Sequence, residues 1–178
     1  ADPHERGHGQ LYAHQFIVID SFPLHSNGYN GDLTRTFLKG APSQWHKDVY
    51  NAVKEAQELA LSLIKPEADG GAIHKQVQSC IASKGFETGK KEGSWYGFFH
   101  GTGHGVGLEV HDFPRGTISG SSWILKPGHV TSVEPGLYYA PGLHSSGMGG
   151  CRIEDVVAVT ENGHDNLTTL SKEDWVIA

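Results

Sequence analysis

Hydrophobic residues follow two different spacings along the chain, and each spacing predicts a different kind of element. Residues 16–20 form a short apolar run that ends in an acid, and residues 28–38 are rich in aromatic and β-branched side chains. Both patterns are typical of strands. Between them, Pro23 and the pair Asn27-Gly28 mark turns. The chain is therefore expected to open with β structure.

Two later segments carry apolar residues at helical spacing. The first spans residues 43–64, where Ser43 is placed to cap a helix and Pro66 to stop it. Its apolar face comprises Val49, Val53, Ala56, Ala60 and Leu63 or Ile64. A shorter helix is predicted over about residues 72–83, with Gly85 at its end. Both helices are expected to serve as scaffold.

The second half of the chain returns to β character after an irregular stretch. Residues 89–127 are rich in glycine, whereas residues 129–139 and 151–160 again resemble strands. The order of strands, helices and strands with hairpin-like returns favours the α+β class over a doubly wound sheet. A chain of 178 residues suits one domain, so a single domain over residues 1–178 is predicted.

Composition and charge exclude several classes of function. Hydrophobic residues make up 37% of the chain and charged residues 19%, as in an ordinary globular protein. The net charge of -6, without a basic stripe, argues against nucleic acid as a partner. No apolar run approaches the roughly 18 residues of a membrane span. Two distant cysteines, Cys80 and Cys151, suggest neither a disulfide framework nor a thiolate zinc site, which favours a cytoplasmic location.

Acids embedded in apolar β segments are the first candidates for chemistry. There are four of them, Asp20, Asp32, Glu134 and Glu154. Each could be satisfied by backbone amides or by an arginine such as Arg35 or Arg152. Four acids in one cavity, however, would repel one another unless cations neutralised them. Two divalent ions would balance four carboxylates, and one added imidazole gives a ligand set that suits Mn, Co, Fe or Zn.

Residues 98–112, with the sequence FFHGTGHGVGLEVHD, could supply that imidazole from His100, His104 or His111. The glycines between them argue against a helical pair of zinc ligands, and no glutamate follows His100 as an HExxH motif requires. A dinucleotide or phosphate loop is also excluded, because neither GxGxxG nor GK[ST] occurs there. Glycines here let the backbone pass close to a site. A histidine-rich turn without metal stays open.

Five motifs in a fixed order resemble the pita-bread metallopeptidases, in the branch of aminopeptidase P and prolidase that cleaves bonds preceding proline. They are Asp20, GDLTRTF, HGTGHGVGLEVHD, VEPGLYY and RIED. The resemblance extends over the chain from about Asp2 and implies the pita-bread fold. Domains of that family begin some tens of residues before the first ligand. The chain is therefore expected to lack the first helices and strands of the fold and to be the carboxy-terminal catalytic part of a longer enzyme.

The resemblance also implies a ligand set for two divalent ions, manganese first, with cobalt, zinc or iron as alternatives. Asp20 and Asp32 would hold one metal, and His104 and Glu134 would complete the shell of the second together with Asp32. Glu154 would bridge both ions. A metal-bridging water or hydroxide would attack the scissile carbonyl, with Glu134 as the proton shuttle.

Further residues would contact substrate by the same resemblance. His111 would bond to the carbonyl or leaving group, and His100 would line the pocket near the proline, so both join Glu134 as catalytic candidates. For His100, a hydrogen-bonding role behind the ligands is the alternative. Arg152 would support the site, and His4 occupies about the place of another substrate-contacting histidine.

Three other side chains near these motifs are not expected to act in catalysis. Tyr138 and Tyr139 are predicted to be core rather than pocket wall. Cys151 should face away from Glu154 along a strand, which argues against a catalytic thiol.

These features lead to one favoured function and two alternatives. The favoured function is dinuclear metal-dependent hydrolysis of Xaa-Pro bonds in a proline-containing peptide, by an aminopeptidase or a dipeptidase. The alternatives are a metal-free hydrolase similar to creatinase and a non-catalytic pita-bread module that binds proteins. A homodimer, or association with the missing amino-terminal part, is expected. The length of the peptide substrate and the native metal stay open.

Overall fold

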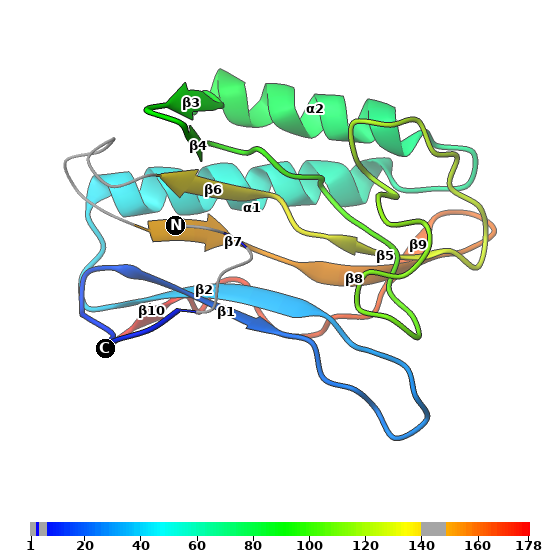
Figure 1. The fold of residues 1–178 in the computed structure, drawn as a ribbon, viewed down its shortest axis with the longest axis horizontal. Coiled ribbons are helices and arrows are strands. Elements are labelled where there is room, and N and C mark those ends of the chain that lie inside the picture. Colours follow the sequence, from blue (N-terminus) through cyan, green and yellow to red (C-terminus); the bar gives the residue numbers. More distant parts are fainter. Residues whose placement is uncertain (1–2, 4–6, 140–148) are drawn as a thin grey trace.

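The computed structural model describes residues 3, 7–139 and 149–178. Figure 1 shows two helices running side by side along the strands. The elements in chain order are β1 (Phe16–Ser21), β2 (Leu33–Lys39), α1 (Gln44–Leu63), α2 (Gly70–Ser83), β3 (Gly89–Lys91), β4 (Ser94–Tyr96), β5 (Val130–Val133), β6 (Gly136–Tyr139), β7 (Gly149–Arg152), β8 (Asp155–Val159), β9 (His164–Asn166) and β10 (Val176–Ile177). The predicted α+β class is confirmed.

Strands β1 and β2 form an antiparallel hairpin in which Asp20 lies opposite Thr34. Strand β10 joins β2 in parallel. The strand predicted over residues 28–38 begins only at Leu33, so its first part was wrong. Residues 22–32 instead form a long hairpin connection, closed by a bridge between Leu24 and Asn30. The predicted turn at Asn27-Gly28 lies within it, and Gly28 adopts a φ of 90°.

Helix α1 begins and ends close to its predicted boundaries. The Ser43 side chain accepts a hydrogen bond from the backbone N–H of His46, and the His46 ring reaches back to the backbone N–H of Ser43. The apolar face predicted for this helix is buried against the strands and α2: Val49, Val53, Ala56, Ala60 and Ile64.

Helix α2 begins two residues earlier than predicted, at Gly70. Asp69 caps it by accepting from the backbone N–H of Gly71 at 3.0 Å. Glycine is a poor helix former, but these positions lie against other backbone. A Cβ added at Gly70 would be 1.8 Å from the carbonyl oxygen of Thr117. Close packing therefore decides this helix start over intrinsic propensity.

Each of the two strands predicted in the second half is divided in two. Residues 134–135 separate β5 from β6, and residues 153–154 separate β7 from β8. Strand β5 pairs with β8 while β6 pairs with β7, so the two breaks lie opposite each other. Each break carries one of the candidate acids, Glu134 or Glu154. No helix among the described residues is long and apolar enough to cross a membrane.

Candidate metal centre

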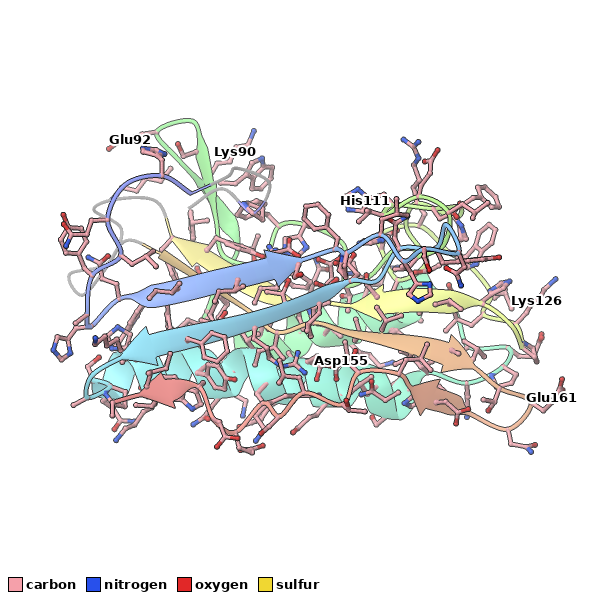
Figure 2. All side chains as sticks on the ribbon, turned by 90° about the horizontal axis from the view of Figure 1, so that it is seen from below. Lys90, Glu92, His111, Lys126, Asp155 and Glu161 are labelled. Atoms are coloured by element: carbon pink, nitrogen blue, oxygen red, sulfur yellow. The ribbon has the colours of Figure 1, made fainter. Side chains whose placement is uncertain are left out.

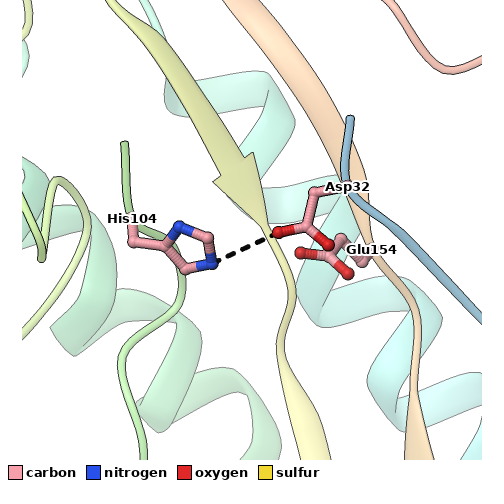
Figure 3. A group of neighbouring side chains, drawn as sticks. All are labelled: Asp32, His104 and Glu154. Atoms are coloured by element: carbon pink, nitrogen blue, oxygen red, sulfur yellow. Dashed lines mark ion pairs between the residues drawn. The ribbon is translucent and has the colours of Figure 1, made fainter. Parts of the chain in front are cut away.

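Asp32, His104 and Glu154 converge from three segments that are far apart in sequence. One ligand atom from each side chain lies within 4.8 Å of the other two. Asp32 directly precedes β2, His104 lies between β4 and β5, and Glu154 lies in the break between β7 and β8 (Figure 3). All three residues are buried, with 8%, 8% and 2% of their surface exposed. Three buried groups of this kind form a candidate metal site.

Glu134 and Asp20 complete the group of sequence-predicted ligands in the same region. Glu134 Oε1 is 3.1 Å from His104 Nε2, and the Ser132 hydroxyl donates to the same oxygen at 3.1 Å. Asp20 is exposed, and its Oδ2 accepts a hydrogen bond of 2.5 Å from Arg152. The β1–β2 register places Asp20 opposite Thr34, two residues after Asp32. The fold thus gathers all five predicted ligands, whereas metal binding by them stays a prediction.

A backbone ladder holds His104 and Glu134 side by side. Ser132 donates its N–H to the carbonyl oxygen of His104 at 2.8 Å, and Glu134 donates to that of Thr102 at 2.7 Å. Gly103 lies between them, where an added Cβ would be 2.0 Å from the carbonyl oxygen of Ser132. This glycine lets two backbone segments meet next to the site, as expected for the glycine-rich motif.

The buried carboxyl groups of Asp32 and Glu154 are poorly compensated by positive charge. Burial raises the pKa of Asp32 from 3.8 to about 7, and repulsion from Asp20 and Glu134 adds to the rise, although His104 and Arg152 oppose it. Burial likewise raises the pKa of Glu154 well above its ordinary value, with further repulsion from Glu134 and Asp32. Without a cation the cluster therefore favours protonated carboxyls.

His104 and Glu134 shift in the direction of a charged pair. Burial alone would raise the pKa of Glu134, but its hydrogen bond with His104 and the nearby charges of His100, His104 and Arg152 outweigh burial and lower it. Burial would lower the pKa of His104, but the same hydrogen bond and the charge of Glu134 raise it. Glu134 is thus ionised more readily than Asp32 and Glu154, whose pKa values are raised.

A second polar network connects the acids to His100. The Tyr138 hydroxyl is 3.0 Å from His100 Nε2 and accepts a hydrogen bond of 3.0 Å from Arg152. Arg152 also donates to the Thr34 hydroxyl at 3.1 Å, and Thr34 donates to Glu154 Oε2 at 2.7 Å. Arg152 therefore contacts Asp20 and Thr34, whereas its role toward substrate stays a prediction.

Sequence reasoning missed Thr34 and assigned Tyr138 to the core. Tyr138 is indeed buried, but its hydroxyl lies at the centre of the polar network. A signal for Thr34 was present in the sequence. Alternation along a strand places a residue two positions after Asp32 on the same face, and Thr34 stands there.

The remaining predicted site residues have different surroundings. His111 is exposed, and its ring lies edge-on to that of His104 with centroids 4.2 Å apart. His4 lies outside the described residues. Cys151 is buried, and burial raises the pKa of its thiol to about 12, which agrees with its exclusion as a nucleophile.

Comparison with known families identifies the chain's relatives. The sequence profile of metallopeptidase family M24 matches residues 1–161. This chain belongs to metallopeptidase family M24. The resemblance to that family found in the motifs is therefore confirmed, and the motifs are those of an M24 protein.

Curated M24 relatives include peptidases of known and unknown specificity. An uncharacterized peptidase of Bacillus subtilis, YqhT, is 39% identical over 96% of this chain and 44% of its own length. A Xaa-Pro dipeptidase of Pyrococcus furiosus is 39% identical over 88% of this chain and 40% of its own. The M24 chain described here spans less than half the length of these curated relatives.

Solved structures confirm the pita-bread fold. The X-Pro aminopeptidase of Thermotoga maritima superposes with a TM-score of 0.83 at 34% identity, over 98% of this chain and 46% of that protein. The prolidase of Pyrococcus furiosus superposes with a TM-score of 0.81 at 36% identity, over 95% of this chain and 46% of that protein. The M24 chain thus has the architecture of the corresponding part of these proteins.

Proposed function

We propose that this M24 chain carries the catalytic centre of a metallopeptidase that hydrolyses peptide bonds preceding proline. Two divalent ions would be held by five side chains, Asp20, Asp32, His104, Glu134 and Glu154. The observation that carries the proposal is the burial of Asp32 and Glu154 beside His104, with both carboxyl pKa values raised. The names of the relatives, Xaa-Pro dipeptidase and X-Pro aminopeptidase, support the choice of proline peptides.

The donor set of the described residues fits divalent cations. Repulsion between the buried carboxylates destabilises their ionised form, and bound divalent cations would offset this repulsion. Carboxylate oxygens with a single imidazole nitrogen suit manganese, with cobalt, iron and zinc as alternatives. The group of Asp32, His104 and Glu154 contains no sulfur ligand and only one histidine.

Bound ions would supply Lewis acidity to the scissile carbonyl and lower the pKa of an attacking water. Glu134 would accept the proton of that water. Its lowered pKa keeps the carboxylate ionised and able to take up a proton, and its Oε1 is held by His104 and Ser132. His111, which is exposed and edge-on to His104, would donate to the carbonyl oxygen or the leaving nitrogen. His100 would line the proline side of the pocket, oriented by Tyr138.

Arg152 would orient the acids. Its guanidinium contacts Asp20, Tyr138 and Thr34, so one buried cation links the exposed acid to the network that reaches Glu154. His4 is proposed as a further substrate contact by motif alone. A homodimer or association with an amino-terminal part, and a cytoplasmic location that agrees with free Cys80 and Cys151, also belong to this proposal.

Metal analysis combined with turnover tests the proposed function. Protein purified with manganese should bind about two ions per chain and hydrolyse Ala-Pro or a longer Ala-Pro peptide, and chelation should abolish turnover. The variant Glu134→Gln should lose at least a hundredfold in kcat while keeping its circular dichroism spectrum, because a general base contributes about 10²–10⁴-fold. Unchanged turnover in this variant would remove Glu134 from catalysis.

The same measurements separate the alternatives. A metal-free hydrolase similar to creatinase would keep its activity after chelation. A protein-binding module would bind fewer than one ion per chain and hydrolyse none of the peptides. Because Asp32, His104 and Glu154 converge in the fold, we favour the metallopeptidase over both.

A further inference from the structure

An aromatic path leads from the candidate centre to the surface of the protein. Phe99 lies 5.5 Å from the ring of Tyr138 and 6.3 Å from that of His100, measured between centroids. On its other side Phe99 stacks with Trp95, at 6.3 Å and an interplanar angle of 25°. Trp95 is 51% exposed. A large apolar side chain is thus left half open to solvent at the end of a path that begins at the site.

The hairpin that carries Trp95 is fixed to the strand that follows Glu134. Gly97 and Tyr138 exchange two backbone hydrogen bonds, of 2.7 and 3.1 Å. Within the hairpin Lys90 pairs with Trp95, and the Lys90 ammonium lies 4.6 Å from the centre of the indole. Figure 2 shows the tip of this hairpin, marked by Lys90 and Glu92, projecting on the same side of the molecule as His111.

We propose that Trp95 is a specificity-determining residue for peptides longer than a dipeptide and packs against the apolar side chain that follows the proline. This inference rests on the proposed function, in which the proline of the substrate lies beside His100. A substrate that extends beyond the proline along the path would meet Phe99 and then Trp95. Burial of an apolar side chain against the indole would be favourable, whereas a polar side chain would gain little. The preferred substrates are therefore oligopeptides with an apolar third residue.

Turnover of matched peptides tests this role. With the manganese-loaded protein, kcat/KM for Ala-Pro-Leu should exceed that for Ala-Pro-Ser by about tenfold, the lower end of what an apolar contact gives. Trp95→Ala should reduce this preference to less than about twofold, and Trp95→Phe should retain most of it. The control Lys91→Gln, in an exposed position of the same hairpin, should leave the preference intact. Equal losses for both peptides in Trp95→Ala would overturn the proposal.

A binding measurement without metal keeps this inference separate from the proposed function. Protein treated with chelator is titrated with Ala-Pro-Leu, and the indole N–H resonance of Trp95 is followed by NMR after assignment with Trp95→Phe. We expect a shift with Ala-Pro-Leu that is several times larger than with Ala-Pro-Ser. No shift with either peptide would overturn the role of Trp95, even where hydrolysis is observed. A shift without hydrolysis in the loaded protein would support Trp95 and contradict the peptidase.

Discussion

Asn30 and Gly107 are joined by two hydrogen bonds across 77 positions of the chain. The backbone N–H of Asn30 donates to the carbonyl oxygen of Gly107 at 2.8 Å, and its side-chain amide donates to the same oxygen at 3.2 Å. The amide also donates to the carbonyl oxygen of Leu108 at 3.0 Å. The connection between Asp20 and Asp32 is thereby tied to the loop that carries His111.

Removal of the Asn30 amide should loosen the loop of His111. Asn30→Ala is expected to cost about 1 kcal/mol, the usual net value of such hydrogen bonds. Amides of residues 105–113 should exchange with deuterium several times faster, because the loop loses its contact with the hairpin. Mass spectrometry of exchange in the metal-free protein measures this directly. The nearly isosteric Asn30→Asp, which replaces the donor with an acceptor beside two carbonyls, should exchange at least as fast. Wild-type exchange rates in both variants would contradict the role of Asn30.

Gly103 should tolerate no side chain. The Cβ of alanine would lie 2.0 Å from the carbonyl oxygen of Ser132, within the ladder that aligns His104 and Glu134. Neither backbone segment can move without breaking hydrogen bonds, so Gly103→Ala should cost about 3 kcal/mol or more. Urea unfolding measures the change. At Gly120 no atom lies within 4 Å of an added Cβ, so Gly120→Ala serves as the matched control. Equal stability of both variants would contradict the close packing.

Periodicity predicted the scaffold better than it predicted the strands. The apolar face of α1 repeats along most of the helix, from Val49 to Ala60, so its burial followed from the pattern alone. Residues 129–139 and 151–160 appear continuous because β-branched or aromatic residues lie on both sides of Glu134 and Glu154. The breaks at these two acids arise because β5 pairs with β8 and β6 pairs with β7, and strand pairing is not a local property of the sequence.

The candidate site was predicted by motif order, whereas its supporting contacts were not. Asp32, His104 and Glu154 were expected together and converge. Core was preferred over pocket wall for Tyr138 because its neighbours in the sequence are apolar or aromatic, and only the fold shows its hydroxyl between His100 and Arg152. Such contacts depend on side-chain directions in the packed structure.

His104 and His111 should differ in their effect on metal binding. His104 is buried within reach of Asp32 and Glu154, whereas His111 is exposed and touches the ring of His104. His104→Ala should therefore lose at least one manganese ion per chain. His111→Ala should retain both ions and lose turnover, because it would contact only substrate. Atomic absorption after gel filtration gives the metal content. Equal metal content in the two variants would contradict the assigned roles.

The contribution of Asp32 should make the metal-free protein less stable as the pH rises from about 4 to 7. The pKa of this carboxyl is raised from 3.8 to about 7, so within that interval the folded state holds a proton that the unfolded state releases. The raised pKa of Glu154 acts in the same direction. Asp155 acts oppositely, because its bonds to Lys172 and Asn166 outweigh burial and lower its pKa. The contribution of Asp32 is therefore measured as the difference in Tm between the wild-type protein and a variant that lacks this carboxyl.

Asp32→Asn isolates this contribution, since the amide has nearly the same shape and does not titrate. Relative to the variant, the wild-type protein with chelator should lose several degrees in Tm between pH 5 and pH 7.5, as measured by calorimetry. Added manganese should reverse the trend in the wild-type protein at pH 7.5, because cations bind the ionised cluster. Parallel Tm curves for the two metal-free proteins would show that Asp32 titrates normally. The buried cluster would then not require a cation to hold its charge.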